Sequence, residues 1–245
     1  KGVGYMLVAQ DITALKELER VRLERERAEK QRLLQAFSRY MGPSLTERVM
    51  NDPAILERRE RREAVVLFAD LRGFTRLTVE HPAEDVIELL NDVFSEIYAY
   101  EGVVFDIVGD ELMVSFNVPY EQPDAARRAM QTAIALQKRF AACKEKWARQ
   151  GMAVGLGIGI NRGPVVIGNV GGKERMNYAM VGEAVNIAHR LVDMAADGQI
   201  VASAEVVTEG LTENTGLKVT KLPPTPVKGK DSPQSMVLLE LEDNR

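Results

Sequence analysis

The stretch Ala64–Asp70 reads AVVLFAD, and it decides the fold together with Val103–Phe116, which reads VVFDIVGDELMVSF. The first stretch is an apolar run of strand length that ends in Asp70. The second reads as two short strands joined at Gly109-Asp110, which places Asp110 at an exposed hairpin tip. A single aspartate at a strand end is typical of a cap or a turn. Two carboxylates at the ends of neighbouring strands form a hard oxygen site, suited to Mg²⁺ or Mn²⁺ carrying a polyphosphate.

Hydrophobic periodicity predicts further strands and helices along residues 63–242. The predicted strands are 64–69, 103–107, 111–117, 153–160, 164–168, 176–181, 199–203, 217–222 and 235–241, and the predicted helices are 83–100, 123–149, 183–196 and 204–210. Helices placed between strand pairs favour an α+β fold, with a mixed or antiparallel sheet flanked by helices, over a doubly wound parallel sheet. Gly155–Gly159 (GLGIG) alternates glycine with apolar residues, which indicates a closely packed strand rather than a phosphate-binding loop.

Amino-acid composition limits the classes of partner that the chain can bind and the cellular compartment that suits it. A chain of 245 residues with 45% hydrophobic content is enough for one sizeable domain with an appendage. The net charge of −4 argues against nucleic acid as the main partner. The single cysteine, Cys143, excludes an intrachain disulfide and favours a cytoplasmic setting; we expect it to be a packing residue. No apolar run reaches the ~18–20 residues of a membrane helix. Because the chain lacks an initiator Met, we expect a piece of a longer protein, which could be membrane-anchored.

Three elements are expected ahead of the globular part. Residues 1–12 contain the strand-like GYMLVAQDI, which is similar to the last strand of a PAS-type sensor domain. Residues 13–41 are rich in Glu and Arg at helical spacing and carry a thin apolar stripe, which favours a parallel two-stranded coiled coil over a solvated single helix. Gly42-Pro43 is expected to end this helix, and residues 42–58 form a short helical linker.

A second group of candidate side chains lies in the C-terminal half. Asn186 and Arg190 are four residues apart in the predicted helix 183–196, so they project from one face. An amide and a guanidinium on one face can hold a sugar oxygen and a phosphate, although the segment alone also fits an ordinary exposed polar face. Lys228, in the turn PVKGK, offers a cation for a β- or γ-phosphate or is a surface residue. We expect His189, which points elsewhere, to be structural or at the surface.

These segments, in this order, resemble the catalytic domain of class III nucleotide cyclases, the adenylate and guanylate cyclases. The segments are FADLRGFT, FDIVGDELMVSF, GIGINRGPVVIGNVG, NYAMVGEAVNIAHRL and PVKGK, and the resemblance covers roughly residues 59–241. The preceding QAFSRYMGPSLTERVM is similar to the helical element that links sensors to bacterial cyclases. We therefore expect a cyclase catalytic domain over residues 59–245.

The resemblance also implies roles for five residues. Asp70 and Asp110 would bind two Mg²⁺ or Mn²⁺ ions, Asn186 and Arg190 would orient the ribose and stabilise the transition state, and Lys228 would bind the triphosphate. In this family one catalytic domain supplies the metal carboxylates and another supplies the remaining residues. Each chain here carries both sets, which implies a homodimer with two equivalent sites.

Two further positions are implied to read the purine, and here they are Asp106 and Ala179. Adenylate cyclases typically place a lysine at the first position, and guanylate cyclases a glutamate. Adenine N1 accepts a hydrogen bond, whereas guanine N1–H and the 2-amino group donate, so a carboxylate suits guanine. Ala179 can neither donate nor accept. Asp106 is one methylene shorter than Glu, so it favours GTP only weakly and need not reach the base.

The function that these residues favour is conversion of a nucleoside triphosphate into the 3′,5′-cyclic nucleotide and pyrophosphate, by a two-metal mechanism at a homodimer interface. ATP is the alternative substrate. A catalytically silent cyclase-like module is a further alternative, but it would have no reason to keep the metal pair, Asn186, Arg190 and Lys228. A coiled-coil interaction protein explains residues 13–41 and nothing beyond them.

Overall fold

The computed structural model describes residues 13–94, 102–172, 176–212, 216–224 and 233–242. The expected sensor strand within residues 1–12 and the predicted phosphate-binding Lys228 lie outside these ranges.

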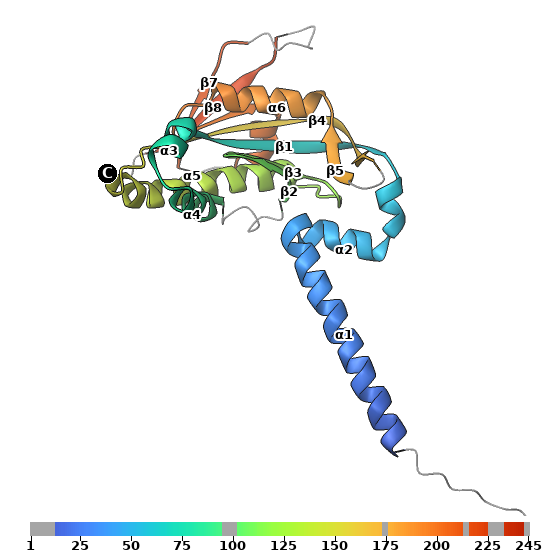
Figure 1. Ribbon diagram of the computed structural model, residues 1–245. Coiled ribbons are helices and arrows are strands. Elements are labelled where there is room, and N and C mark those ends of the chain that lie inside the picture. Colours follow the sequence, from blue (N-terminus) through green and yellow to red (C-terminus); the bar gives the residue numbers. More distant parts are fainter. Residues whose placement is uncertain (1–12, 95–101, 173–175, 213–215, 225–232, 243–245) are drawn as a thin grey trace, which may run out of the picture.

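A single mixed sheet forms the centre of the domain (Figure 1). Its strands are β1 (Glu60–Arg72), β2 (Val103–Val108), β3 (Glu111–Phe116), β4 (Gly155–Gly171), β5 (Met176–Val181), β6 (Gln199–Ser203), β7 (Leu217–Lys221) and β8 (Met236–Leu241). The order is β2-β3-β1-β4-β6-β8-β7, with β5 paired to β4 off this path. The pairing of β4 with β6 is parallel, and the other pairings are antiparallel.

Helices cover both faces of this sheet. They are α3 (Phe74–Glu80), α4 (Ala83–Phe94), α5 (Ala125–Arg149), α6 (Glu183–Met194) and α7 (Ala204–Gly210). Figure 1 shows α6 on one face and α4 and α5 on the other. The predicted α+β fold, with a mixed sheet flanked by helices, is therefore confirmed.

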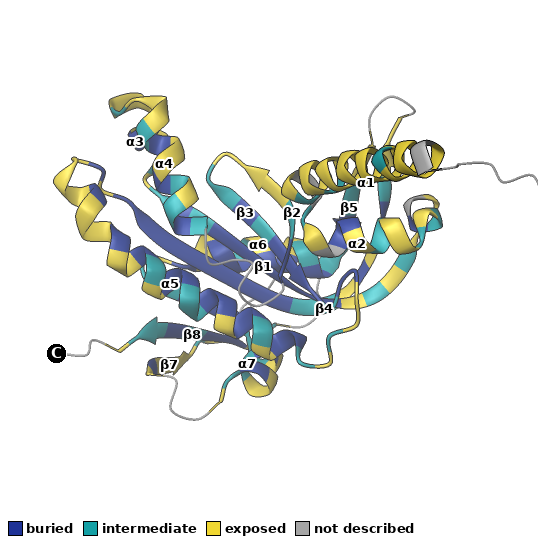
Figure 2. Ribbon diagram, turned by 90° about the horizontal axis from the view of Figure 1, so that it is seen from below, coloured by how far each residue is buried: buried dark blue, intermediate teal, exposed yellow. Residues whose placement is uncertain are grey.

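Strand β1 is apolar on both faces because both faces are covered. Val65, Leu67 and Ala69 pack with α5 and its neighbours, whereas Val66 and Phe68 pack with residues of α6. Every residue from 64 to 69 is buried, and Figure 2 shows the same burial along the centre of the sheet. Burial on both faces explains why this run is continuously hydrophobic instead of alternating.

The N-terminal helix leaves the domain as a long arm. Helix α1 (Thr13–Met41) projects away from the sheet, and its described side chains are mostly exposed (Figures 1 and 2). Gly42, at φ 78°, separates it from α2 (Pro43–Asn51), which leads through the 3₁₀ helix η1 (Pro53–Glu57) into β1. The predicted helix is confirmed, whereas its pairing into a coiled coil stays a prediction.

Strand β4 differs from the sequence prediction. Residues 153–160 and 164–168 were expected to form two strands, but Gly155–Gly171 is one strand of 17 residues paired with β1 along most of its length. Pro164, which lacks an N–H, lies between the part of β4 that pairs with β6 and the part that pairs with β5. The missing donor therefore costs no hydrogen bond on that side.

One short helix, α3, was not predicted, and it begins directly after Gly73. It is shorter than two full turns of apolar periodicity, so it gives no helical signal in the sequence. The expected helical linker over residues 42–58 contains α2 and η1.

Candidate active site

Asp70 and Asp110 meet at one end of the sheet. Asp70 follows the buried Ala69 near the end of β1, and Ala69 pairs with Leu112 of β3. Asp110 lies in the turn between β2 and β3, where Gly109 adopts φ 64°. This left-handed conformation favours glycine, and it aims the next residue at the end of β1. The structure therefore brings the two predicted metal ligands together.

The two carboxyl groups share a hydrogen bond, and this changes their electrostatics. Burial, and then the hydrogen bond and negative charge of Asp70, raise the pKa of Asp110 to about 6. Ionisation of both carboxyl groups is unfavourable because their negative charges repel, and a cation between them would relieve this repulsion. The pair thus fits a divalent cation that prefers oxygen ligands. Across the described ranges, no cluster of three His, Cys, Asp or Glu side chains forms a metal site.

Arg72 ties this carboxylate pair to helix α6. Its guanidinium contacts the Asp70 carboxylate and the Val192 carbonyl, and its Nε donates to the Ala195 carbonyl at 3.0 Å. A positive group at the last carbonyls of a helix complements the helix dipole. A Cβ on Gly157 would lie 2.7 Å from this guanidinium, so glycine at that position leaves room for Arg72. Sequence reasoning missed Arg72.

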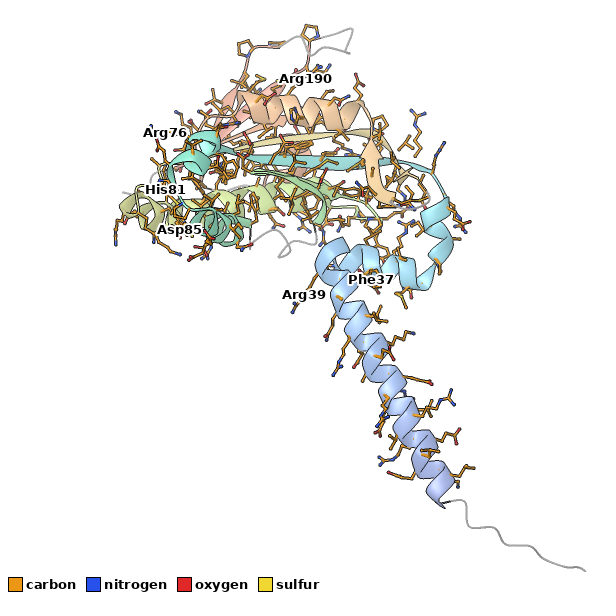
Figure 3. All side chains as sticks on the ribbon, viewed as in Figure 1. Phe37, Arg39, Arg76, His81, Asp85 and Arg190 are labelled. Carbon is orange, nitrogen blue, oxygen red and sulfur yellow. The ribbon has the colours of Figure 1, made fainter. Side chains whose placement is uncertain are left out.

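Helix α6 directs Asn186 and Arg190 away from the sheet. Its buried face consists of Ala184, Ile187, Ala188, Leu191 and Val192. Positions 186 and 190 fall on the opposite side of the helical wheel, and Figure 3 shows Arg190 on the outer side of α6. The predicted pair therefore shares one outward face, whereas Asp70 and Asp110 belong to the sheet beneath.

His189 lies on the flank of α6 and contacts the β2–β3 hairpin that carries Asp110. Its Nε2 is 3.0 Å from Glu111 Oε2, and its ring meets Phe68 edge-on with 5.3 Å between centroids. Asp193, one turn further along the helix, lies 3.8 Å from Nδ1. The sequence prediction of a structural or surface role missed this link to Glu111.

Asp106 and Ala179 line the same pocket, between β2, β3, β5 and α2. The pocket has a volume of about 460 Å³. Phe105 and Tyr178 stack beside it, with ring centroids 5.9 Å apart, and Leu45 of α2 contributes to its wall. This size, with the stacked aromatic pair in the wall and the Asp106 carboxylate beside it, suits a flat heteroaromatic group that carries hydrogen-bond donors.

Asp106 is exposed at a bulge in β2. Its carboxylate accepts a hydrogen bond from the N–H of Ile107 at 3.0 Å, and a second carboxylate oxygen is left for a ligand. A slightly larger hollow of about 510 Å³ lies at the start of α5 and contains none of the predicted site residues. We therefore regard the pocket that contains Asp106 as the candidate for the base.

Comparison with known proteins agrees with this geometry. A sequence model of the family described as "Adenylate and Guanylate cyclase catalytic domain" matches residues 56–240. The chain belongs to this family. The solved structure of the adenylyl cyclase CyaB from P. aeruginosa is 30% identical, with a TM-score of 0.67 over 74% of this chain and 95% of that chain. The guanylyl cyclase Cya2 is 28% identical, with a TM-score of 0.64 over 75% of this chain and 93% of that chain.

Curated relatives of this cyclase-family chain are longer proteins. An uncharacterized protein of Mycobacterium tuberculosis is 32% identical over 235 residues, which are 93% of this chain and 40% of the relative. Adenylate cyclase 1 of Rhizobium meliloti is 31% identical over 156 residues, which are 61% of this chain and 24% of the relative. The chain thus spans well under half the length of these relatives. None of the helices in the described part of the chain has the length and apolar character that crossing a bilayer requires.

Proposed function

We propose that this cyclase-family domain converts a purine nucleoside triphosphate into its 3′,5′-cyclic nucleotide and pyrophosphate, at a site shared by two copies of the chain. The observation that carries the proposal is the hydrogen-bonded pair of Asp70 and Asp110 at the sheet edge. Asp110, with its raised pKa, lies beside Asp70, whose carboxylate contacts Arg72, and such a carboxylate pair is suited to bind a divalent cation. A nucleotide substrate would place the domain in the cytoplasm.

The protein's own groups would bind and orient the reacting atoms. Mg²⁺ or Mn²⁺, two ions per site when bound by Asp70 and Asp110, would supply Lewis-acid activation of the ribose 3′-hydroxyl and neutralise the triphosphate. Asn186 would hold the ribose, and Arg190 would donate to the oxygens of the α-phosphorus as charge develops there. Lys228 would hold the β- and γ-phosphates. The 3′-hydroxyl would lose its proton to water, its oxygen would form a bond to the α-phosphorus, and the bond from that phosphorus to pyrophosphate would break.

Outward placement of Asn186 and Arg190 supports a shared site. Within one chain these two residues face away from the sheet edge that carries Asp70 and Asp110. A two-fold dimer can bring the outer face of α6 from one copy to the carboxylates of the other, and it does so twice. Two equivalent composite sites would result, and an isolated monomer would be inactive. Helix α1 and an upstream sensor domain would control how the two copies are oriented.

The same pocket supports a moderate preference for GTP. Asp106 would accept hydrogen bonds from guanine N1–H and the 2-amino group, whereas adenine N1 would face it as a second acceptor. Ala179 offers no second polar contact, and one hydrogen bond is worth only about 1 kcal/mol net. Both adenylyl and guanylyl cyclases occur among the similar structures, so ATP is the alternative substrate.

One incubation series tests the activity and the base together. The purified dimer is incubated with each of the four nucleoside triphosphates and with Mg²⁺ or Mn²⁺, and the products are separated by chromatography. We expect cyclic GMP in excess of cyclic AMP, and Asp106→Lys should shift the ratio toward cyclic AMP by placing a donor opposite adenine N1. Efficient formation of cyclic AMP with negligible cyclic GMP would overturn the assignment of Asp106. A folded dimer that forms neither product would instead be a silent cyclase-like module.

A further inference from the structure

Helix α6 is held at two points to the segments that carry the metal carboxylates of its own chain. Near its middle, His189 lies 3.0 Å from Glu111, the residue directly after Asp110. At its C-terminal end, Arg72 contacts the carbonyls of Val192 and Ala195 and also the Asp70 carboxylate. Each tie therefore joins α6 to one of the two proposed metal ligands or to its immediate neighbour.

The tie through His189 is not needed to fill the core. Buried apolar residues already seat α6 on the sheet, among them Ala188 and Leu191. The side chain of His189 is 48% exposed, and that of Glu111 is 27% exposed. Truncation of His189 would therefore leave no closed cavity, and the domain should still fold.

The two ends of each tie serve different active sites. This step rests on the proposed function, in which Asn186 and Arg190 of one chain complete the site of the partner's Asp70 and the partner's Asp110. Within a chain, the Glu111 end belongs to one site and the α6 end belongs to the other. A change in the position or order of one site can therefore reach the second site through two side chains, Glu111 and His189.

We propose that the contact between His189 and Glu111, supported by Arg72, couples the two active sites of the dimer, and that His189 is a positioning residue. A nucleotide bound at Asp70 and Asp110 orders the turn that precedes Glu111. Glu111 in turn fixes His189 and with it the helix that carries Asn186 and Arg190. The second nucleotide binds a helix that is already ordered, so it binds more tightly than the first.

Equilibrium binding tests this coupling without turnover. The dimer is titrated calorimetrically with 3′-deoxy-GTP and 3′-deoxy-ATP in the presence of Mn²⁺, because these nucleotides lack the attacking hydroxyl. Protein concentrations are chosen at which sedimentation detects dimers only, so that assembly does not imitate cooperativity. We expect a Hill coefficient above 1 and below the two-site limit of about 2 for the wild type.

Three variants assign the effect to the contact. His189→Ala should retain two binding sites per dimer with a Hill coefficient clearly below that of the wild type, because the His189 tie is broken while the Arg72 tie and the residues of each site remain. His189→Gln, whose amide can donate to Glu111, should recover cooperativity. The matched control is His81→Ala, which removes the chain's other histidine, away from α6 (Figure 3); it should behave as the wild type.

The outcomes separate this inference from the proposed function. Non-cooperative binding by the wild type, or unchanged cooperativity in His189→Ala, would overturn the coupling while cyclase activity stands. A folded dimer that neither binds the deoxynucleotides with Mn²⁺ nor turns over any triphosphate would contradict the proposed function itself.

Discussion

Asp110 is the residue whose electrostatics bear most directly on metal binding. Its pKa is raised from 3.8 to about 6, first by burial and then by Asp70. Between about pH 4 and pH 6 the carboxyl group of Asp110 is therefore protonated in the folded, metal-free protein, whereas it is ionised in the unfolded chain. Stability from this group is present below about pH 4 and is lost as the pH rises through 6. Above that pH the two carboxylates repel, and a cation can replace the proton.

Metal-free Asp110→Asn should accordingly unfold at a higher temperature than the wild type at pH 8, and the difference should shrink toward pH 4. Thermal unfolding in the presence of a chelator measures both proteins across this range. Comparing the variant with the wild type cancels the contributions of other titrating groups to the pH dependence. Asp124 is one such group, and its pKa is lowered to about 2 by Arg127 and Arg128. Addition of Mn²⁺ at pH 8 should stabilise the wild type and not the variant. A difference that is constant from pH 4 to pH 8 would contradict the assignment.

Residues that act locally were predictable from the sequence, and residues that act across the fold were not. Asp70 and Asp110 follow apolar strands, so the neighbouring residues indicate that each aspartate lies at a strand end. Arg72 reaches Ala195, which is 123 positions away, and no local pattern indicates such a contact. The contact of His189 was not predictable for the same reason, because His189 lies in α6 and its partner Glu111 lies in β3, far away in the sequence.

At the scale of elements, the packing of α6 on β4 depends on glycine. A Cβ on Gly159 would overlap the backbone of Ala188 and Val192. The alternating glycines of this stretch were predicted to allow close packing, and the contact with α6 confirms that reading. Strand β4 was nevertheless predicted as two strands, because Pro164 and the polar Asn161 and Arg162 interrupt the apolar pattern while β1 keeps the backbone paired throughout.

Gly159→Ala should therefore lower the free energy of unfolding by about 1–3 kcal/mol or more, since an overpacked core must shift backbone to relieve the clash. Gly172→Ala is the matched control, because a Cβ at that position meets nothing within 4 Å. Urea denaturation of both variants measures the effect. Equal stability of the two variants would show that α6 does not rest on β4 as described.

The exposed apolar stripe of helix α1 predicts that α1 contributes to dimer formation. Its described side chains are mostly exposed in one chain, including Leu18 and Phe37 at 70% and 55%, so a second copy is the expected partner for its apolar stripe. Removal of residues 1–41 should leave a folded domain that dimerises weakly, and its specific activity should rise steeply with protein concentration. Activity of the truncated protein that is independent of concentration at nanomolar levels would argue against this role.

The whole molecule is expected to work only as a dimer, because one chain points the two halves of the proposed site in different directions. Asp70→Ala removes a metal ligand from one half, and Arg190→Ala removes the phosphate-binding cation from the other. Each homodimer should be inactive with an intact fold. A heterodimer of the two variants would combine the intact carboxylates of one chain with the intact α6 of the other, so it regains one complete site of its two.

Mixing these two inactive proteins is the most direct measurement of the shared site. After verified subunit exchange at equal amounts, about half of the dimers are mixed and each has one working site, so activity should return to roughly a quarter of the wild type. A mixture of Asp70→Ala with Asp110→Ala is the control and should stay inactive, because both defects then lie in the same half of the site. No recovery in the first mixture, or equal recovery in both, would contradict the composite site.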